Sequence, residues 1–271
     1  MPLTNVTLAT IIPNRYSAAT SLELARAITD VCSPTDPVTF ASSGIYIFWD
    51  TATQQILYIG LAVDLGLRFR QHNGLVDCDI SSCKRTKIVD HFERHPYLGY
   101  SVLAQSPLDQ AMCSAWTQSL PEDLHLFADE FSWIGKVQAV KVYNSPLVKA
   151  LRWMEGLLIR AYIKKCRRGP LWNRNSGAQI SYTGRQLALA VDILNAAVCV
   201  ESAAKPQVSR CSLIELSSNP NFAAFESYLH GVRMIAGTGS SLSAAAKQIP
   251  DMGGYWQRMA ETGYFRKNLQ L

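Results

Sequence analysis

The sequence lacks the features of a secreted or membrane-spanning protein. Residues 1–30 contain no basic segment followed by a long apolar run, which a secretory signal requires. No stretch of the chain reaches the ~18 apolar residues that a membrane-spanning helix needs. Cysteines are few and odd in number, seven among 271 residues, and they are scattered among apolar neighbours. We therefore expect reduced thiols, a cytoplasmic location and no membrane partner.

The sequence also lacks the signatures of several enzyme families. It contains no glycine-rich phosphate-binding loop and no Ser/His/Asp hydrolase motif. Acidic residues are outnumbered, with 21 Asp and Glu against 26 Lys and Arg, which gives a formal net charge of +5 and a pI of about 8.8. A basic chain suits an anionic partner such as nucleic acid, although the charge balance alone does not prove one.

The chain has enough apolar material to build a core, because 48% of its residues are hydrophobic. We expect three regions along it. Residues 1–41 form an N-terminal helical lead-in, residues 42–178 form a central domain with an insertion at about 76–135, and residues 179–271 form a helical C-terminal region.

A β-hairpin followed by a helix is expected early in the central domain. Residues 44–49 and 55–60 are rich in β-branched and aromatic side chains and flank a polar turn, which is typical of paired strands. A helix should begin after Asp64, a good N-cap residue, and end at about His72, where Asn73 and Gly74 follow.

Other elements follow from the same kinds of pattern. Ser145 should cap one helix and Pro146 should lie in its first turn, and Gly169 and Pro170 should end this same helix. The further elements that we expect are helices at 21–30, 84–95, 147–165, 183–201, 221–236, 243–249 and 255–262, and strands at 97–103 and 136–143.

Six polar residues from four of these segments form a candidate chemical site: Tyr46, Tyr58, Arg68, His72, Glu155 and Asn173. The two tyrosines lie at the centres of the paired strands. The arginine and the histidine are four positions apart on the next helix and share one face. The glutamate lies at the edge of an apolar helix stripe, where a carboxylate is costly to bury unless a metal or a donor meets it. The asparagine follows a turn that contains proline.

Taken together, these residues resemble the GIY-YIG nuclease superfamily. Gly44-Ile45-Tyr46 and Tyr58-Ile59-Gly60, whose tyrosines are separated by eleven residues, resemble its name-giving motif. The Arg-x-x-x-His helix, the Glu helix and a Pro-x-x-Asn element follow in the same order. The resemblance covers roughly residues 42–175. It implies an α+β fold, with a small antiparallel β-sheet flanked by helices, an insertion and helical extensions at both ends, and a nuclease domain at 42–178.

The resemblance also implies a division of labour in phosphodiester cleavage. Glu155 would be the ligand of Mg²⁺ (or Mn²⁺), a hard cation that accepts one carboxylate and keeps several waters. Arg68 would hold the scissile phosphate with its guanidinium fork. One of the two tyrosines would take the proton of the attacking water, and the sequence does not decide which. His72 would assist this transfer or bind the phosphate, and Asn173 would orient a neighbouring group or the DNA backbone.

Two departures from the superfamily pattern stand out. Many members carry a lysine directly after the second tripeptide, where this chain has Leu61. The separation between His72 and Glu155 is also long, which predicts additional secondary structure between the two helices.

A cationic run without acidic residues follows the glutamate: Arg160, Lys164, Lys165, Arg167, Arg168 and Arg174. Beside a nuclease site, such a run is expected to bind the phosphate backbone of DNA. The alternative is a solvated helix end whose cations complement the helix dipole.

Simpler interpretations of the site residues stay open. The tyrosines could be ordinary strand residues, since tyrosine favours β-strands, and Glu155 could pair with Arg152 on an exposed helix face. Asn175 competes with Asn173 as the closing asparagine.

A separate pattern invites a zinc interpretation. Cys78 and Cys83 precede His91 and His95, but the two pairs are close together for a zinc finger. Buried or idle thiols are the preferred interpretation.

The sequence thus predicts a metal-dependent endonuclease that hydrolyses DNA, with a restriction-type or defence role favoured because no long linker or separate DNA-reading unit is visible. The alternatives are a catalytically silent nucleic-acid-binding module and a structure-specific nuclease of DNA repair.

Overall fold

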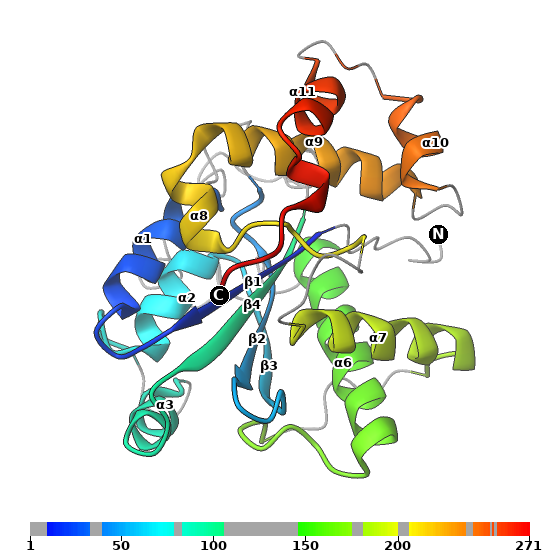
Figure 1. Cartoon of the computed structure of the whole chain (residues 1–271). Coiled ribbons are helices and arrows are strands. Elements are labelled where there is room, and N and C mark those ends of the chain that lie inside the picture. Colours follow the sequence, from blue (N-terminus) through cyan, green and yellow to red (C-terminus); the bar gives the residue numbers. More distant parts are fainter. Residues whose placement is uncertain are drawn as a thin grey trace, which may run out of the picture.

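The fold is built on one small antiparallel sheet. The computed structural model describes residues 10–32, 40–78, 83–105, 146–174, 181–199, 206–236, 241–249, 251 and 254–271. Four strands lie in the order β1-β4-β2-β3 (Figure 1), with bounds Thr10–Tyr16 for β1, Gly44–Asp50 for β2, Ile56–Ala62 for β3 and Leu98–Ala104 for β4. Every neighbouring pair is antiparallel. The hairpin strand β3 is therefore an edge strand.

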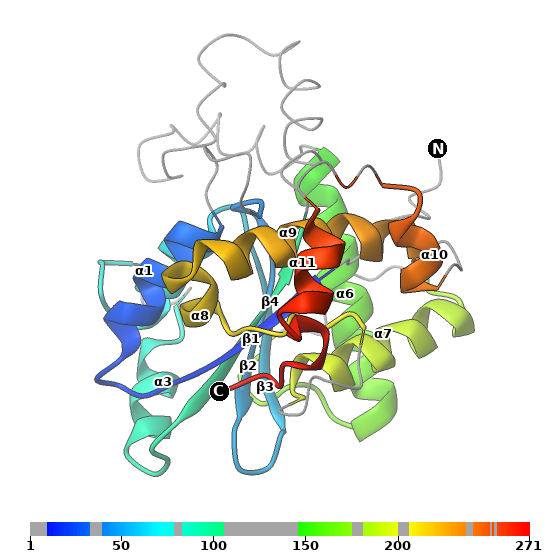
Figure 2. The same cartoon turned by 45° about the horizontal axis from the view of Figure 1, so that its top comes forward.

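Helices cover both faces of the sheet. Their bounds are Ser21–Val31 for α1, Leu65–His72 for α2, Arg85–Phe92 for α3, Pro146–Cys166 for α6, Gly184–Ala197 for α7, Leu213–Ser218 for α8, Pro220–Ala236 for α9, Leu242–Ala246 for α10 and Tyr255–Glu261 for α11, followed by a 3₁₀ turn at Tyr264–Arg266. Figures 1 and 2 show α6 and α7 on one side of the sheet and α1, α2 and α8 on the other. Each side has its own apolar cluster.

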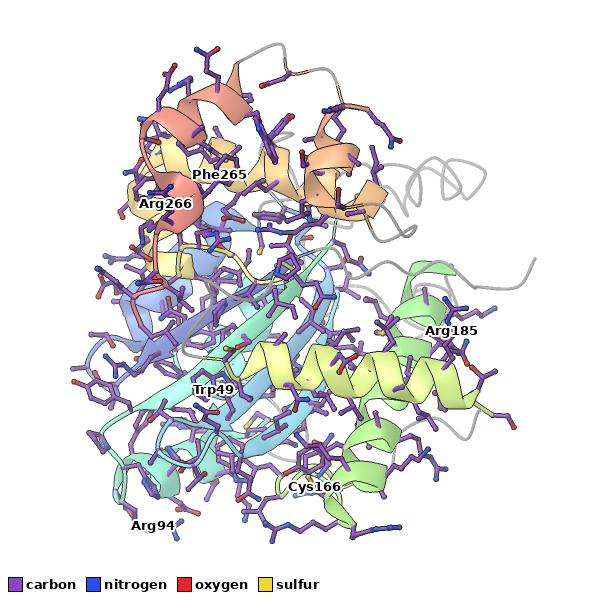
Figure 3. All side chains as sticks on the ribbon, turned by 45° about the vertical axis from the view of Figure 1, so that its right-hand side comes forward. Trp49, Arg94, Cys166, Arg185, Phe265 and Arg266 are labelled. Carbon is purple, nitrogen blue, oxygen red and sulfur yellow. The ribbon has the colours of Figure 1, made fainter. Side chains whose placement is uncertain are left out.

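The alternation of side chains along β2 explains these two clusters. Tyr46 and Phe48 belong to the cluster beneath α1 and α2, whereas Ile45, Ile47 and Trp49 belong to the cluster beneath α6 and α7. Successive residues of a strand point to opposite faces, so a strand buried on both sides has no polar face. In Figure 3, Trp49 marks the side of the sheet that faces α7.

The α+β class and most of the expected elements are confirmed. The hairpin, α1, α2, α3, α6, α7, α9, α10 and α11 form where the pattern indicated them. Asp64 caps α2 as expected, because its Oδ1 accepts a hydrogen bond of 2.8 Å from the backbone N–H of Leu67. The strand expected at 136–143 lies outside the described residues.

The expected insertion needs a correction. The range 76–135 contains β4, which is a central strand of the sheet and pairs with β1 and β2. The strand itself was predicted, but its place in the sheet depends on partners distant in sequence. The central sheet thus extends into the range that sequence analysis had set aside.

The expected helical lead-in over 1–41 also needs a correction, because Thr10–Tyr16 is strand β1. Pro13 interrupts its short apolar run, and proline is tolerated in strands mainly at sheet edges, where β1 lies. The run therefore gave too weak a strand pattern to be recognised.

A buried polar network fixes the C-terminal helix α9 on β1. Arg233 forms an ion pair of 2.7 Å with Glu226, and both side chains are almost fully buried. The Nη1 of Arg233 also donates to Thr10 Oγ1 at 3.1 Å, and that oxygen lies 2.9 Å from Nδ1 of His230. Buried charges need such partners. The helices after residue 178 therefore share the core of the sheet, while the domain boundary proposed there stays a prediction.

Within the described residues, no helix combines the length and the apolar character that crossing a membrane would require.

Candidate functional site

The two tyrosines of the hairpin lie side by side on the face covered by α2. In the register of β2 and β3, Tyr46 is opposite Gly60 and Phe48 is opposite Tyr58. The two tyrosine rings have centroids 5.8 Å apart. A Cβ at position 60 would lie 2.6 Å from the hydroxyl oxygen of Tyr46 and from a ring carbon of Tyr58. The glycine of the second tripeptide is thus what lets both rings approach each other.

We predict that Gly60→Ala destabilises the fold by about 1–3 kcal/mol, the usual cost of overpacking a buried site. The added methyl group must push against two rings, one of which is fully buried. Gly184→Ala is the matched control, because a Cβ there meets no atom within 4 Å and alanine favours the first turn of α7. Urea unfolding measures both, and equal stability of the two variants would contradict this role of Gly60.

His72 connects α2 to the tyrosine pair. Its Nε2 lies 2.7 Å from the hydroxyl oxygen of Tyr46, and its Nδ1 accepts the backbone N–H of Lys84 at 3.0 Å. Burial, together with the charges of Arg68 and Lys84, holds the pKa of His72 well below its usual value. The ring is therefore neutral with its proton on Nε2, and it donates this proton to Tyr46.

The hydrogen bonds give the tyrosine pair a direction. Because the oxygen of Tyr46 accepts from His72, its own O–H is free to donate to Tyr58, to which it is hydrogen-bonded. Burial raises the pKa of both hydroxyls, but the bond from Tyr46 lowers that of Tyr58. Tyr58 is also the less buried of the two. The chain His72–Tyr46–Tyr58 thus ends at the less buried of the two tyrosines.

Arg68 is the electrostatic neighbour that the site residues share. It lies one turn before His72 on α2, and its Nη1 donates to Gln71 Oε1 at 3.0 Å. Its positive charge shifts the pKa of the residues around it, which are Tyr46, Tyr58, His72, Lys84 and Glu155. This arrangement places a half-buried guanidinium within reach of every titratable group of the site.

Lys84 is a site residue that sequence analysis missed. Its Nζ lies 4.8 Å from the centre of the Tyr58 ring, and its backbone N–H orients His72. Burial and the nearby charges of Arg174 and Arg68 lower the pKa of Lys84. No motif marks this lysine, because it precedes α3 and meets Tyr58 only through the packing of that helix beside α2.

Glu155 approaches the site from the opposite face of the sheet. Its helix α6 packs on the side away from the tyrosines, but the carboxylate reaches the free edge of β3 and accepts the backbone N–H of Leu61. Burial raises the pKa of Glu155 to about 7, against the lowering effects of Arg152, the Leu61 bond and Arg68. Arg152 is a neighbour, as the simpler interpretation expected, yet the carboxylate is half-buried and faces Arg68 as well.

Asn173 binds the same strand edge through its side chain. Its Oδ1 accepts from the backbone N–H of Ile59 at 3.0 Å, and its Nδ2 donates to the carbonyl of Ile59 at 2.8 Å. The N–H of Trp172 donates to the carbonyl of Leu57 at 2.7 Å. The segment thus replaces a further strand along β3 and satisfies backbone groups of this edge. Asn173 therefore orients β3 itself; Asn175 lies outside the described residues.

The structure thus brings all six predicted site residues to β3 or its immediate neighbours. Glu155 fits a hard divalent cation. Burial makes its carboxyl group costly to ionise, and the single backbone N–H that it accepts offsets only part of this cost. Among the described residues, no cluster of three potential metal ligands includes it. The remaining ligands would have to be water and substrate oxygens, as Mg²⁺ prefers.

The cationic run does not face one direction. Arg174 acts on Lys84 at the site, whereas Lys165 donates to Asn195 of α7, and Arg168 lines a pocket with Tyr162 near the hairpin turn. Arg160 is half-buried, and Lys164 and Arg167 are exposed. Arg174 is thus the member of the run that the structure associates with the candidate site.

The two thiols of the proposed zinc pattern do not join its histidines. Cys78 donates to the carbonyl of Gln71, and no described cluster of potential ligands contains Cys78 or Cys83. Both thiols are half-buried, and neither is part of a disulfide.

Comparisons with known proteins leave the family open: no protein-family model, curated protein or solved structure matches the chain significantly.

Proposed function

We propose that the chain is a metal-dependent endonuclease that hydrolyses DNA phosphodiester bonds with a site of the GIY-YIG type. The observation that carries the proposal is the directed hydrogen-bond chain His72–Tyr46–Tyr58, which ends beside the guanidinium of Arg68 and the carboxylate of Glu155. Packing alone accounts for aromatic rings. It does not account for a carboxylate and two cations that lie half-buried around one hydroxyl.

In the proposed mechanism, Tyr58 acts in its ionised form: its phenolate oxygen takes the proton of the attacking water and becomes a neutral hydroxyl. Tyr46 donates a hydrogen bond to this oxygen while it is negative, and His72 keeps Tyr46 in this orientation. The positive charges of Arg68 and Lys84 favour the ionised form of Tyr58. Tyr46 suits the supporting role better, because it is fully buried and its oxygen already accepts from the histidine.

Arg68 and Glu155 would handle the phosphate. The guanidinium fork of Arg68 is suited to the non-bridging oxygens of the scissile phosphate, where charge develops. Glu155 would hold Mg²⁺, which when bound stabilises negative charge and provides an acidic water for the leaving oxygen. Glu155 must be ionised for this task, so its pKa of about 7 predicts weaker metal binding in mildly acidic solution.

Lys84 offsets the departure of this chain from the superfamily pattern. Leu61 stands where many members carry a lysine, and it supplies no charge. Lys84 places an ammonium group over the Tyr58 ring from the start of α3 instead. The site therefore keeps a second cation beside the tyrosine, although it comes from a different segment.

The proposal is tested by incubating the purified chain with supercoiled plasmid and Mg²⁺. We expect nicked and linear products that disappear with a chelator. Arg68→Lys, purified in parallel, should cut at least about tenfold more slowly, because an ammonium keeps the charge but cannot present a planar fork. This variant also excludes a contaminating nuclease. DNA binding without any cleavage by the wild-type chain would instead establish the silent binding module.

The biological setting that we propose is restriction or defence, and structure-specific repair is the alternative. These roles differ in their DNA rather than in their chemistry. Comparing duplex, single-stranded and branched substrates, with the cut positions sequenced, separates them: defined sites in duplex DNA support restriction, and a preference for branched DNA supports repair.

A further inference from the structure

Three potential metal ligands converge away from the candidate nuclease site. Asp50 is the last residue of β2, His91 lies in the final turn of α3, and His95 follows this helix. Each can offer one ligand atom, and the three atoms all lie within 4.8 Å of one another. Arg94, labelled in Figure 3, marks this end of α3, which lies far from the C-terminal helices.

One carboxylate oxygen of Asp50 holds the side chain in place, and the other is available to a metal ion. Its Oδ1 accepts the backbone N–H groups of Ala52 and Thr53, at 3.0 and 2.7 Å, and the hydroxyl of Thr53 at 2.9 Å. Its Oδ2 lies 3.8 Å from Nδ1 of His95. This distance is too long for a hydrogen bond. It is close to the ~3.3 Å that separates two ligands of one tetrahedral metal ion.

His91 is oriented as a metal-binding histidine usually is. Its Nε2 lies 3.1 Å from the carbonyl oxygen of Tyr97 and donates its proton there, which leaves the lone pair on Nδ1. Metal-ligating histidines commonly donate their other N–H to a backbone carbonyl in this way. The His91 ring is buried and stacks on that of His95, with centroids 4.6 Å apart. Buried packing thus fixes the ligand orientation before any metal binds.

We infer that Asp50, His91 and His95 bind a divalent transition metal, with Zn²⁺ as the preferred ion and a fourth position open to solvent. Two imidazoles and one carboxylate are ligands that Zn²⁺ accepts, whereas Mg²⁺ prefers oxygen ligands alone. The open position follows from His95, whose side chain is 42% exposed. The site would join the end of β2 to the end of α3. It does not depend on nuclease activity, because its residues lie outside the proposed cleavage site.

The test is metal binding by the untagged, reduced full-length chain. After removal of bound metal, equilibrium dialysis against Zn²⁺ should show one binding site that His95→Asn weakens at least about tenfold, the minimum effect of perturbing a metal's immediate surroundings. Asp50→Asn should weaken it as well. This variant retains an oxygen that can accept the bonds from Ala52 and Thr53, and it replaces the free oxygen with an amide nitrogen. Zn²⁺ should raise the Tm of the wild-type chain but not of these variants.

Glu93→Gln is the matched control, because it removes an exposed carboxylate between the two histidines without removing a ligand. It should bind Zn²⁺ like the wild-type chain. All variants retain every cysteine, so thiol binding cannot explain a difference between them. Since His95 is half-exposed, His95→Asn decides the question even where Asp50→Asn folds poorly.

Co²⁺ distinguishes the ligands directly. In the wild-type chain its visible spectrum should show nitrogen and oxygen ligation without the near-ultraviolet sulfur-to-cobalt charge-transfer band that thiolates produce. That band, or equal affinity of the wild-type and His95→Asn chains for Zn²⁺, would overturn the inference. Loss of binding in Glu93→Gln to the same degree as in His95→Asn would overturn it too.

Discussion

Glu155→Gln should reduce Mg²⁺-dependent cleavage by about a thousandfold or more while DNA binding is retained. An amide is a poor ligand for a hard cation, and losing several kcal/mol of charge stabilisation corresponds to a rate loss of this size. The amide oxygen can still accept the backbone N–H of Leu61, so this group of β3 keeps its hydrogen-bond partner. Single-turnover cleavage at saturating Mg²⁺ measures the rate, and gel shift without metal measures DNA binding.

The same substitution has a pH-dependent effect on stability that does not involve DNA. The folded chain raises the pKa of Glu155 from 4.5 to about 7, so ionising this carboxyl opposes folding. Wild-type stability should therefore fall, relative to Glu155→Gln, as the pH rises from 4.5 through 7. Above that range the difference is constant, and the wild-type chain has lost at most about 3 kcal/mol relative to the variant, compared with its position below pH 4.5, in metal-free buffer. Tm measured at pH 5 and pH 8 checks this.

Mg²⁺ should then act in the opposite direction. At pH 8 it should raise the Tm of the wild-type chain and leave that of Glu155→Gln unchanged, because it binds the ionised carboxylate. Glu93→Gln is the control, because Glu93 is an exposed carboxylate directly after α3. This variant should behave like the wild-type chain in every assay. Near wild-type cleavage by Glu155→Gln would show that Glu155 is not the metal ligand.

Tyr58→Phe should lower the cleavage rate by roughly a hundredfold or more, the usual contribution of a general base. Tyr46→Phe should lower it less, because it removes only the donor that steadies the Tyr58 oxygen. Both variants keep the aromatic ring, so packing against Phe48 should survive. Single-turnover rates with saturating enzyme measure both effects.

The pH profiles separate the roles of these residues. Burial raises the pKa of Tyr58, so the fraction of ionised tyrosine, and with it the wild-type rate, should rise through the alkaline range. Tyr58→Phe should lose this rise and keep the increase near pH 7 that comes from Glu155. A larger rate loss in Tyr46→Phe than in Tyr58→Phe would make Tyr46 the general base and Tyr58 its supporting donor. Wild-type rates and pH profiles in both variants would show that neither hydroxyl takes part in proton transfer.

Much of the candidate site could be predicted because its residues are close together in the sequence. The two tripeptides of the hairpin, and the Arg68 and His72 pair on one helix face, are local patterns whose geometry follows from strand pairing and helix periodicity. The same holds for the Asp64 cap. Such features depend on a few neighbouring residues, so the printed sequence is sufficient to place them.

The parts that could not be predicted depend on partners far apart in the chain. Lys84 reaches Tyr58 only because α3 follows α2 and packs beside it. Asn173 was expected to orient a neighbouring group or the DNA backbone, and only the structure shows that the group it binds is the backbone of Ile59 on β3. The thiols and histidines of the zinc pattern lie near each other in sequence, yet Asp50 is the residue that meets His91 and His95.

By itself, the sequence determined the α+β class, the hairpin and α2, because apolar periodicity, turn residues and caps act within a few residues. It also ordered the six site residues along the chain. Only the tertiary structure decided that β1 and β4 complete the sheet and that Glu155 reaches the site around the edge of β3. The direction of the His72–Tyr46–Tyr58 bonds was decided there as well. Burial, strand order and hydrogen-bond direction arise from contacts between distant segments, and no local pattern encodes them.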